Sequence, residues 1–337
     1  MMERYSRQLL FSPIGEEGQK KLLKSHVLIV GAGALGCANA EMLARAGIGK
    51  ITIIDRDYVD WTNLGRQQLY TEEDAECKLP KAVAAQKHLQ RINSTIQIEG
   101  LVGDFSVGAE EIVKGVNLII DGTDNFETRF FINDVSMKYV IPWIHGAVVR
   151  SYGMSVSILP KKTPCYHCLL QAIPSEGLTC DTVGVISPAV QMVASYQTAE
   201  ALKYFVSGEV SKQLVSFDVW RREHSIIDIS KLKKSDCPSC GNNPAYPYLT
   251  METGLKTAVL CGRNTVQIRP QQKQQISLAQ ISKRLQPIVQ NLKVNPYLIS
   301  FQAENVQIVL FQDGRALVHG TKEKEKAKRI YQRFIGA

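Results

Sequence analysis

The sequence VLIVGAGALGCANAEMLARAGIGKITIID, residues 27–55, is the stretch around which the chain is organised. An apolar strand, Val27 to Val30, runs into a glycine-rich turn, then a helix from about Leu35 to Ala46, then a second strand that ends at Asp55. In such a βαβ unit the glycines let the backbone approach a phosphate, and the N–H groups of the helix face that phosphate. A carboxylate at Asp55 can bind ribose hydroxyls. The stretch predicts a nucleotide site whose turn contributes Gly31, Gly33, Ala34 and Gly36.

Strands and helices continue to alternate after this unit. The pattern predicts a helix that starts at Pro80, strands at Ile96–Leu101 and Val116–Ile120, a helix at 128–139 and a strand at Met154–Leu159. This alternation is typical of an α/β fold with a doubly wound, mostly parallel, Rossmann-like sheet, here with an antiparallel extension. The glycine turn, Asp55 and Asp124 each follow the end of a predicted strand, which is where open α/β sheets bind ligands.

The turn-rich segment at 241–248 predicts a domain boundary. Residues 1–245 would form the nucleotide-binding domain, which begins with an amphipathic helical arm over residues 1–24. Its apolar side is expected to include Tyr5, Leu9, Leu10 and Phe11. Residues 246–337 would form a small α+β module of unknown role. Within it we expect a strand at Thr265–Ile268, a helix at Leu278–Val289, two strands around Asp313-Gly314 and a terminal helix.

Composition excludes several classes of protein. With 337 residues, 45% of them hydrophobic and 21% charged, the chain has the material for a sizeable core. Because no apolar run approaches the roughly 18 residues of a membrane span and the start lacks a signal-peptide core, we expect a cytoplasmic protein with no membrane partner. The charged residues that give the net charge of +8 are spread along the chain, with a local basic excess only near the C-terminus, where lysines alternate with Glu323 and Glu325. That pattern favours a solvated helix face over a nucleic-acid site.

Eight cysteines in a reducing compartment point to metal binding or catalysis more than to disulfides. Two C-x-x-C pairs supply four thiolates, which is the ligand set of a structural, tetrahedral zinc site. We interpret His145 as a core histidine with a hydrogen-bond partner, and Cys37, Cys77 and Cys261 as packing residues. The predicted zinc ligands are Cys165, Cys168, Cys237 and Cys240.

The glycine turn by itself would also fit an NAD-dependent oxidoreductase, which uses the same device. The polar residues that follow the second strand favour a triphosphate and Mg²⁺ instead, because guanidinium and ammonium groups suit phosphates and carboxylates suit magnesium. Lys81 would lie in the first turn of a helix, where its charge opposes the helix dipole unless it faces an anion. This set comprises Asn63, Arg66, Lys81, Asp124 and Asn125.

Several of these motifs recur together in one known family. The chain contains, in order, RYSRQ (4–8), GAGALG (31–36), the pair Asp55 and Asp57, NLGRQ (63–67), Pro80-Lys81, DGTDN (121–125) and both C-x-x-C pairs. Over about residues 1 to 245 it therefore resembles the ubiquitin-activating-enzyme-like adenylyltransferases of the ThiF and MoeB group. The resemblance implies ATP-dependent adenylation, with release of pyrophosphate, of the C-terminal Gly-Gly carboxylate of a ubiquitin-fold sulfur carrier protein.

The resemblance also implies roles for individual residues. Asp55 would bind ribose, Asn63, Arg66 and Lys81 would contact phosphates, and Asp124, helped by Asn125, would hold Mg²⁺. Arg7 would reach into the site of a neighbouring subunit, which implies a homodimer. A sulfurtransferase or a cysteine desulfurase is an implied further partner. The chain departs from the family at position 65, where Gly65 replaces the usual glutamine.

Some alternatives stay open at this point. Cys180 resembles a family cysteine implicated in covalent handling of the activated carrier, but it fits a surface or packing cysteine equally well, and Asp181 beside it would raise the pKa of its thiol. We favour a carrier of the ThiS type, in thiamin thiazole synthesis, over a MoaD-type carrier in molybdenum cofactor synthesis. An NAD-dependent oxidoreductase and a catalytically silent nucleotide-binding scaffold are the alternatives from other classes.

Overall fold

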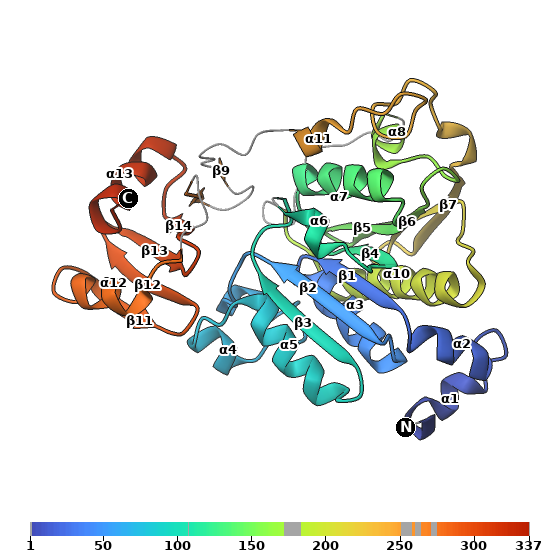
Figure 1. The fold of residues 1–337 in the computed structure, drawn as a ribbon, viewed down its shortest axis with the longest axis horizontal. Coiled ribbons are helices and arrows are strands. Elements are labelled where there is room, and N and C mark those ends of the chain that lie inside the picture. The colour runs from blue at the N-terminus through green and yellow to red at the C-terminus, as the bar shows by residue number, and fades with distance from the viewer. Residues whose placement is uncertain are drawn as a thin grey trace. The chain divides into compact units, whose positions relative to one another are not determined.

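A computed structural model describes residues 2–106, 108–171, 183–250, 258–259, 264–270 and 275–336. The chain forms two compact units, Met1–Met251 and Glu252–Ala337 (Figure 1). Helix α11 (Pro247–Thr250) belongs to the first unit and packs against α7 (Phe126–Tyr139), so the division falls just beyond the turn-rich segment at 241–248.

The first unit is built on one eight-stranded sheet in the order β3-β2-β1-β4-β5-β6-β7-β8. The five strands from β3 to β5 are parallel, and β6, β7 and β8 add an antiparallel extension. This confirms the predicted fold class. The strands are β1 (His26–Val30), β2 (Lys50–Asp55), β3 (Gln97–Val102), β4 (Leu118–Asp121), β5 (Trp143–Val149), β6 (Tyr152–Ile158), β7 (Gln213–Asp218) and β8 (Glu223–Asp228).

Helices cover both faces of this sheet, because its central strands are apolar on both sides. In β1, Val27 and Ile29 face one core, whereas Leu28 and Val30 face the other. The first core is closed by α3 (Ala34–Ala46), α5 (Lys81–Ile92) and α10 (Ser187–Ser207), and the second by α6 (Ala109–Ile112) and α7 (Figure 1). The shorter elements are η2 (Trp61–Asn63), α4 (Glu72–Glu76), α8 (Tyr166–Leu170) and η3 (Ser230–Leu232).

The N-terminal arm is broken rather than one amphipathic helix. It consists of η1 (Met2–Tyr5), α1 (Ser6–Leu9) and α2 (Gly15–Leu22). The break follows from Pro13, which has no N–H to donate, and from Gly15, whose φ of 53° is left-handed. As a result the predicted apolar side is not one continuous face: Tyr5 is buried, whereas Leu10 and Phe11 are 74% and 60% exposed.

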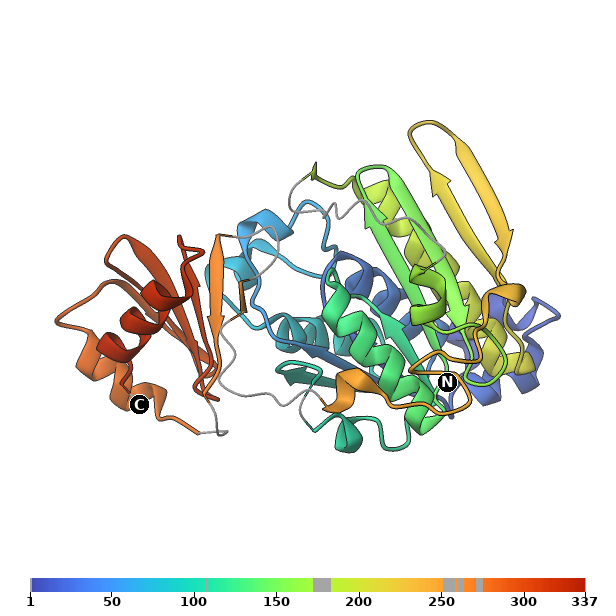
Figure 2. The same ribbon diagram turned by 90° about the horizontal axis from the view of Figure 1, so that it is seen from above.

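The second unit is a six-stranded antiparallel sheet in the order β11-β12-β13-β14-β10-β9, with two helices on one face (Figure 2). The predicted helix at 278–289 ends at Leu285, because Pro287 follows it. The elements are β9 (Ala258–Val259), β10 (Thr265–Ile268), α12 (Leu278–Leu285), β11 (Gln290–Val294), β12 (Leu298–Ala303), β13 (Val306–Phe311), β14 (Ala316–His319) and α13 (Lys324–Phe334). Among the described residues, no helix is long and apolar enough to cross a bilayer.

Candidate functional site

The glycine turn leaves the amino end of α3 open. Gly31 has a φ of +92°, and a Cβ at Gly36 would lie 1.8 Å from the carbonyl oxygen of Gly31, so the fold itself requires glycine at both positions. At Gly33, the N-cap of α3, a Cβ would meet only the carbonyl oxygen of Gly122, at 3.7 Å. Packing does not require glycine there, but a side chain would fill the space in front of the helix N-terminus where a phosphate can bind.

A second loop lies against this turn at the point where the strand order reverses, between β1 and β4. The amide of Gly122 donates to the carbonyl of Val30 at 2.8 Å, and a Cβ on Gly122 would come within 2.5 Å of the oxygen of Gly31. The two loops are therefore in direct backbone contact, at the position where doubly wound sheets bind nucleotides.

Asp55 lies at the end of β2 and bonds to the glycine turn. Its Oδ2 accepts from the amide of Ala32 and its Oδ1 from the amide of Asp57, both at 2.7 Å. Burial raises the pKa of Asp55, while the positive charge of Lys81 acts in the opposite direction. Each carboxylate oxygen retains a second lone pair, so Asp55 can still accept from a ribose hydroxyl.

Lys81 faces an anion, as its place in the first turn of α5 indicated. The anion is Asp57, whose Oδ2 lies 3.0 Å from Nζ of Lys81, and the lysine side chain is only 4% exposed. Sequence reasoning gave Asp57 no role, although the spacing of Asp55 and Asp57 was visible. A lysine ammonium has three protons, so two remain for other acceptors such as phosphate oxygens.

Asn63 and Arg66 are both positioned by η2. Asn63 is buried, and its Oδ1 accepts from the amide of Asp60 in a capping box. Arg66 is half-buried and donates from Nη1 to the carbonyl of Thr62 at 2.8 Å. Because this partner is neutral, the guanidinium retains its charge for an anion. Gly65 is exposed with open space around its Cα, so no packing contact explains the departure from glutamine.

Asp124 is exposed just after the loop that touches the glycine turn. Its neighbour Asn125 uses Oδ1 to cap α7 by accepting from the amide of Thr128 at 2.8 Å. The charge of Asp124 acts on Arg56 and Arg129. Arg56, which sequence reasoning missed, also pairs with Asp104 at 3.2 Å, and it adds a further cation close to this edge of the sheet.

A buried network lies behind Asp124. Asp121, at the end of β4, accepts at Oδ2 from His145 at 2.7 Å and from Arg129 at 3.2 Å. Burial acts to raise the pKa of Asp121, but Arg129 and His145 outweigh it and hold the pKa below its usual value. Burial lowers the pKa of His145, so this residue is neutral and bonded, as its interpretation as a core histidine required. Sequence reasoning gave Asp121 and Arg129 no role.

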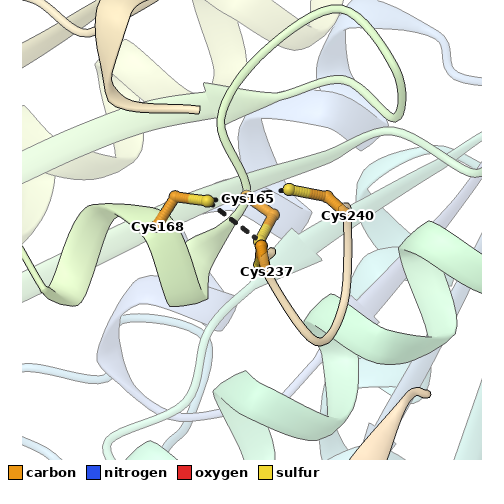
Figure 3. Close-up of side chains that lie close together, drawn as sticks. All are labelled: Cys165, Cys168, Cys237 and Cys240. Carbon is orange, nitrogen blue, oxygen red and sulfur yellow. Dashed lines mark hydrogen bonds between the residues drawn. The ribbon is translucent and has the colours of Figure 1, made fainter. Parts of the chain in front are cut away.

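The four cysteines of the two C-x-x-C pairs converge (Figure 3). Their sulfur atoms all lie within 4.8 Å of one another, with Cys165 and Cys237 at 3.4 Å and Cys168 and Cys240 at 3.6 Å. Tetrahedral zinc with Zn–S bonds of about 2.3 Å places its sulfurs about 3.8 Å apart, so the four thiols fit a zinc ion. His167 is not part of the cluster, and its ring packs against Phe130.

Helix α7 holds both cysteine turns in place. The amide of Tyr166 in the first turn donates to Oδ1 of Asn133 at 2.9 Å. The hydroxyl of Ser239, inside the second turn, donates to Asp134, which also accepts from the amide of Tyr248 at 2.9 Å. Nothing in the sequence marked Asn133 and Asp134, because their partners lie far away along the chain.

Arg7 does not lie at the glycine turn of its own chain. It is exposed, and the adjacent Gln8 donates to the carbonyl of Ala46, at the carboxyl end of α3. Gly33 caps the opposite end of this 13-residue helix, which is about 20 Å long.

The remaining predicted cysteines are placed as follows. Cys180 and Cys261 lie outside the described residues. Cys37 is buried as predicted, and burial raises the pKa of its thiol to about 12. Cys77 is exposed, so its interpretation as a packing residue is wrong; it is the C-cap residue that follows the short helix α4.

Comparison with known proteins identifies the family. The sequence model of the ThiF family matches residues 5–239. The chain belongs to the ThiF family. A ThiF-family relative, the sulfur carrier protein ThiS adenylyltransferase of Bacillus subtilis, is 50% identical over all 337 residues and over the whole of both chains. The sulfur carrier protein adenylyltransferase of Thermus thermophilus is 34% identical over 259 residues, which are 74% of this chain and 94% of that protein.

Solved structures agree on the ThiF-type fold. Escherichia coli MccB superimposes with a TM-score of 0.60 at 22% sequence identity, covering 71% of this chain and 74% of MccB. Membership of the ThiF family also decides against the NAD-dependent oxidoreductase, the alternative that the glycine turn alone left open.

Proposed function

We propose that this chain activates a ubiquitin-fold sulfur carrier protein of the ThiS type. It transfers AMP from ATP to the C-terminal Gly-Gly carboxylate of the carrier and releases pyrophosphate. The observation that supports this most strongly is the identity of 50% over the full length with a ThiS adenylyltransferase. The same full-length match favours the thiazole branch over a MoaD-type carrier.

The chemistry follows from the charges at the site. An oxygen of the carrier carboxylate attacks the α-phosphorus of ATP, the bond from that phosphorus to the bridging oxygen of the β-phosphate breaks, and pyrophosphate leaves. Attacking and leaving groups are all negative, so the reaction needs fixed positive charge and close positioning. Arg66 and Lys81 supply such charge, and no covalent step on the protein is required.

The remaining site residues orient the nucleotide. The amino end of α3, left open at Gly33, receives phosphate, and Asp55 accepts from the ribose. Lys81 binds phosphate with the N–H groups that remain while one of its N–H groups donates to Asp57. Asp124 is the residue that would hold Mg²⁺, which when bound offsets charge on the phosphates. Asn125 contributes by capping α7 beside Asp124.

The same proposal covers assembly and the metal. Arg7 lies about one helix length from the glycine turn of its own chain, which supports its action in the site of a second copy, in a homodimer. The four-cysteine site fits structural zinc, because four protein ligands leave no open position for catalysis. A cytoplasmic location, and a sulfurtransferase or cysteine desulfurase as partner, stay predictions from the sequence.

The test is ATP–pyrophosphate exchange by the full chain, without a carrier, with a ThiS-type carrier and with a MoaD-type carrier. A ThiS-type carrier that lacks the terminal Gly-Gly serves as the matched control. We expect exchange only with the intact ThiS-type carrier. Exchange driven by the MoaD-type carrier would move the assignment to the molybdenum cofactor branch. The proposal fails if neither carrier supports exchange.

A further inference from the structure

The loop that presents Asp124 rests on a buried cluster of polar residues. Asp121 is fully buried, His145 is 3% exposed, and Thr123 and Arg129 are each 8% exposed. These side chains come from three elements, since Asp121 ends β4, Arg129 lies on α7 and His145 lies on β5. None of them is at the surface where ATP would bind, so their role toward the reaction is indirect.

The cluster fixes the peptide groups on both sides of Thr123. Oδ1 of Asp121 accepts from the amide of Thr123 at 2.8 Å and from its hydroxyl at 2.6 Å. On the other side, Nη2 of Arg129 donates to the carbonyl of Thr123 at 2.7 Å. The same guanidinium reaches Oδ2 of Asp121 through Nε. Arg129 therefore holds the carboxylate and the loop backbone with one planar group, which a lysine could not reproduce.

The second carboxylate oxygen is held by the sheet. Oδ2 of Asp121 also accepts from Nδ1 of His145 at 2.7 Å, and Nε2 of Gln197 on α10 donates to the carbonyl of Asp121 at 3.0 Å. An ionised carboxylate can only accept hydrogen bonds, so His145 must carry its proton on Nδ1. His145 and Gln197 thus hold Asp121 itself in place, and Asp121 in turn bonds to Thr123 of the loop.

Asp124 is the next residue, and its position is fixed from both sides. Thr123 precedes it with both peptide groups bonded, and Asn125 follows it with its side chain capping α7. Asp124 is exposed and lies two residues after Gly122, which touches the glycine turn. The buried residues thus hold the backbone of an exposed aspartate. Groups that hydrogen-bond behind a metal ligand commonly orient the ligand in this way.

We propose that Asp121, Thr123 and Arg129 are positioning residues that set the Asp124 carboxylate for the metal ion of Mg·ATP. This inference rests on the proposed function, in which Asp124 holds Mg²⁺. Loss of a group behind a metal ligand typically lowers metal affinity or activity about 10- to 100-fold. The Mg²⁺ concentration needed for half-maximal exchange should therefore change even in variants whose fold is unchanged.

A matched pair of variants at Thr123 isolates the effect. Thr123→Val removes the hydroxyl that donates to Asp121 but keeps the side-chain shape, whereas Thr123→Ser keeps the hydroxyl. We expect Thr123→Val to raise the Mg²⁺ concentration for half-maximal carrier-dependent exchange about tenfold or more, and Thr123→Ser to leave it unchanged. Arg129→Lys, which retains the charge but not the planar geometry, should raise this Mg²⁺ concentration as Thr123→Val does.

Two further measurements separate this inference from a structural effect and from the proposed function. Thermal unfolding identifies variants that merely fold poorly, and calorimetric titration of ATP at several Mg²⁺ concentrations needs no carrier. If the unsubstituted chain shows no exchange but Thr123→Val still shifts the Mg²⁺ dependence of ATP binding, the positioning role is supported and the proposed function is wrong. If Thr123→Val and Thr123→Ser have the same Mg²⁺ dependence in both assays, the positioning role is wrong.

Discussion

The two cations predicted to contact phosphate are held in different ways. The ammonium of Lys81 is buried in an ion pair with Asp57, so its removal would also change the surroundings of a partly buried carboxylate. Arg66 is half-buried, and its hydrogen-bond partner among the described residues is the neutral carbonyl of Thr62, so its removal breaks no ion pair described there. Loss of activity on changing Arg66 is therefore easier to attribute to the reaction than loss on changing Lys81.

Arg66→Ala should slow carrier-dependent ATP–pyrophosphate exchange about a hundredfold or more, because one preorganised group of this kind contributes about 3 to 4 kcal/mol to the transition state. Stability should change by less than about 0.5 kcal/mol, as for most surface substitutions. Arg91→Ala, a change of an exposed arginine on α5, is the control and should affect neither quantity. Exchange within a few fold of the unsubstituted rate would remove Arg66 from the phosphate site.

Cys37 should impose an alkaline limit on stability. Its pKa is about 12 in the folded chain against 9.0 for an ordinary thiol, so the unfolded state loses its proton first as pH rises. The stabilising contribution is complete below pH 9.0 and is lost as pH rises toward about 12. Relative to Cys37→Ala, the free energy of unfolding should fall by on the order of 1 kcal/mol per pH unit in that window. Urea unfolding of the unsubstituted chain and of Cys37→Ala at several pH values measures this difference. The prediction is wrong if the free energy of unfolding has the same pH dependence in both.

At the scale of elements, α7 connects the two functional parts of the first unit. Its N-cap, Asn125, follows Asp124, and its middle residues Asn133 and Asp134 hold both cysteine turns. The helix also carries Arg129 of the buried cluster. A disturbance of α7 should therefore be felt both at the nucleotide edge and at the cysteines.

Removing the cap of α7 tests the first connection. Asn125→Ala should lower the free energy of unfolding by about 1 kcal/mol, whereas Asn125→Asp, which retains an oxygen to accept from the amide of Thr128, should leave it nearly unchanged. Urea denaturation measures both variants. If Asn125→Ala retains full stability but loses exchange, Asn125 contacts the nucleotide directly and its role is not that of a cap.

Removing the metal tests the second connection. The double variant Cys237→Ser, Cys240→Ser should lose bound zinc, and the segment after η3 should become accessible to protease. Structural zinc contributes on the order of 10 kcal/mol in small peptides, so the loss should be large. Cys77→Ser, at an exposed cysteine outside the cluster, should retain the metal. Zinc content is measured by atomic emission, and unchanged zinc in the double variant would overturn the assignment.

At the scale of the whole molecule, a site completed by Arg7 of a second copy makes a distinct prediction. Arg7→Ala and Lys81→Ala should each be inactive as pure proteins. In the proposed homodimer, co-expression should yield mixed dimers in which one of the two sites has both residues intact. Random pairing in a two-fold dimer should then restore roughly a quarter of the unsubstituted activity. Exchange assays on the mixture measure this, and Lys81→Ala with Arg66→Ala, two changes in the same half of the site, should restore nothing.

Most of the fold and part of the site were predictable because their signals are local. The GAGALG turn, the strand and helix periods and the C-x-x-C spacings each act within a few residues, where backbone geometry leaves few alternatives. The arm shows the limit of such patterns, since Leu10 and Phe11 fit an apolar helix face but Pro13 and Gly15 prevented one.

Local sequence patterns were enough to predict the doubly wound class, the glycine turn and the convergence of the two cysteine pairs. The strand order, the pairing of Lys81 with Asp57 and the buried cluster of Asp121, Arg129 and His145 became visible in the folded structure alone. These contacts join residues from separate elements, and a buried charge is stable only where another element supplies its partner. No local sequence pattern encodes such a contact, because the contact depends on how distant elements pack in the complete fold.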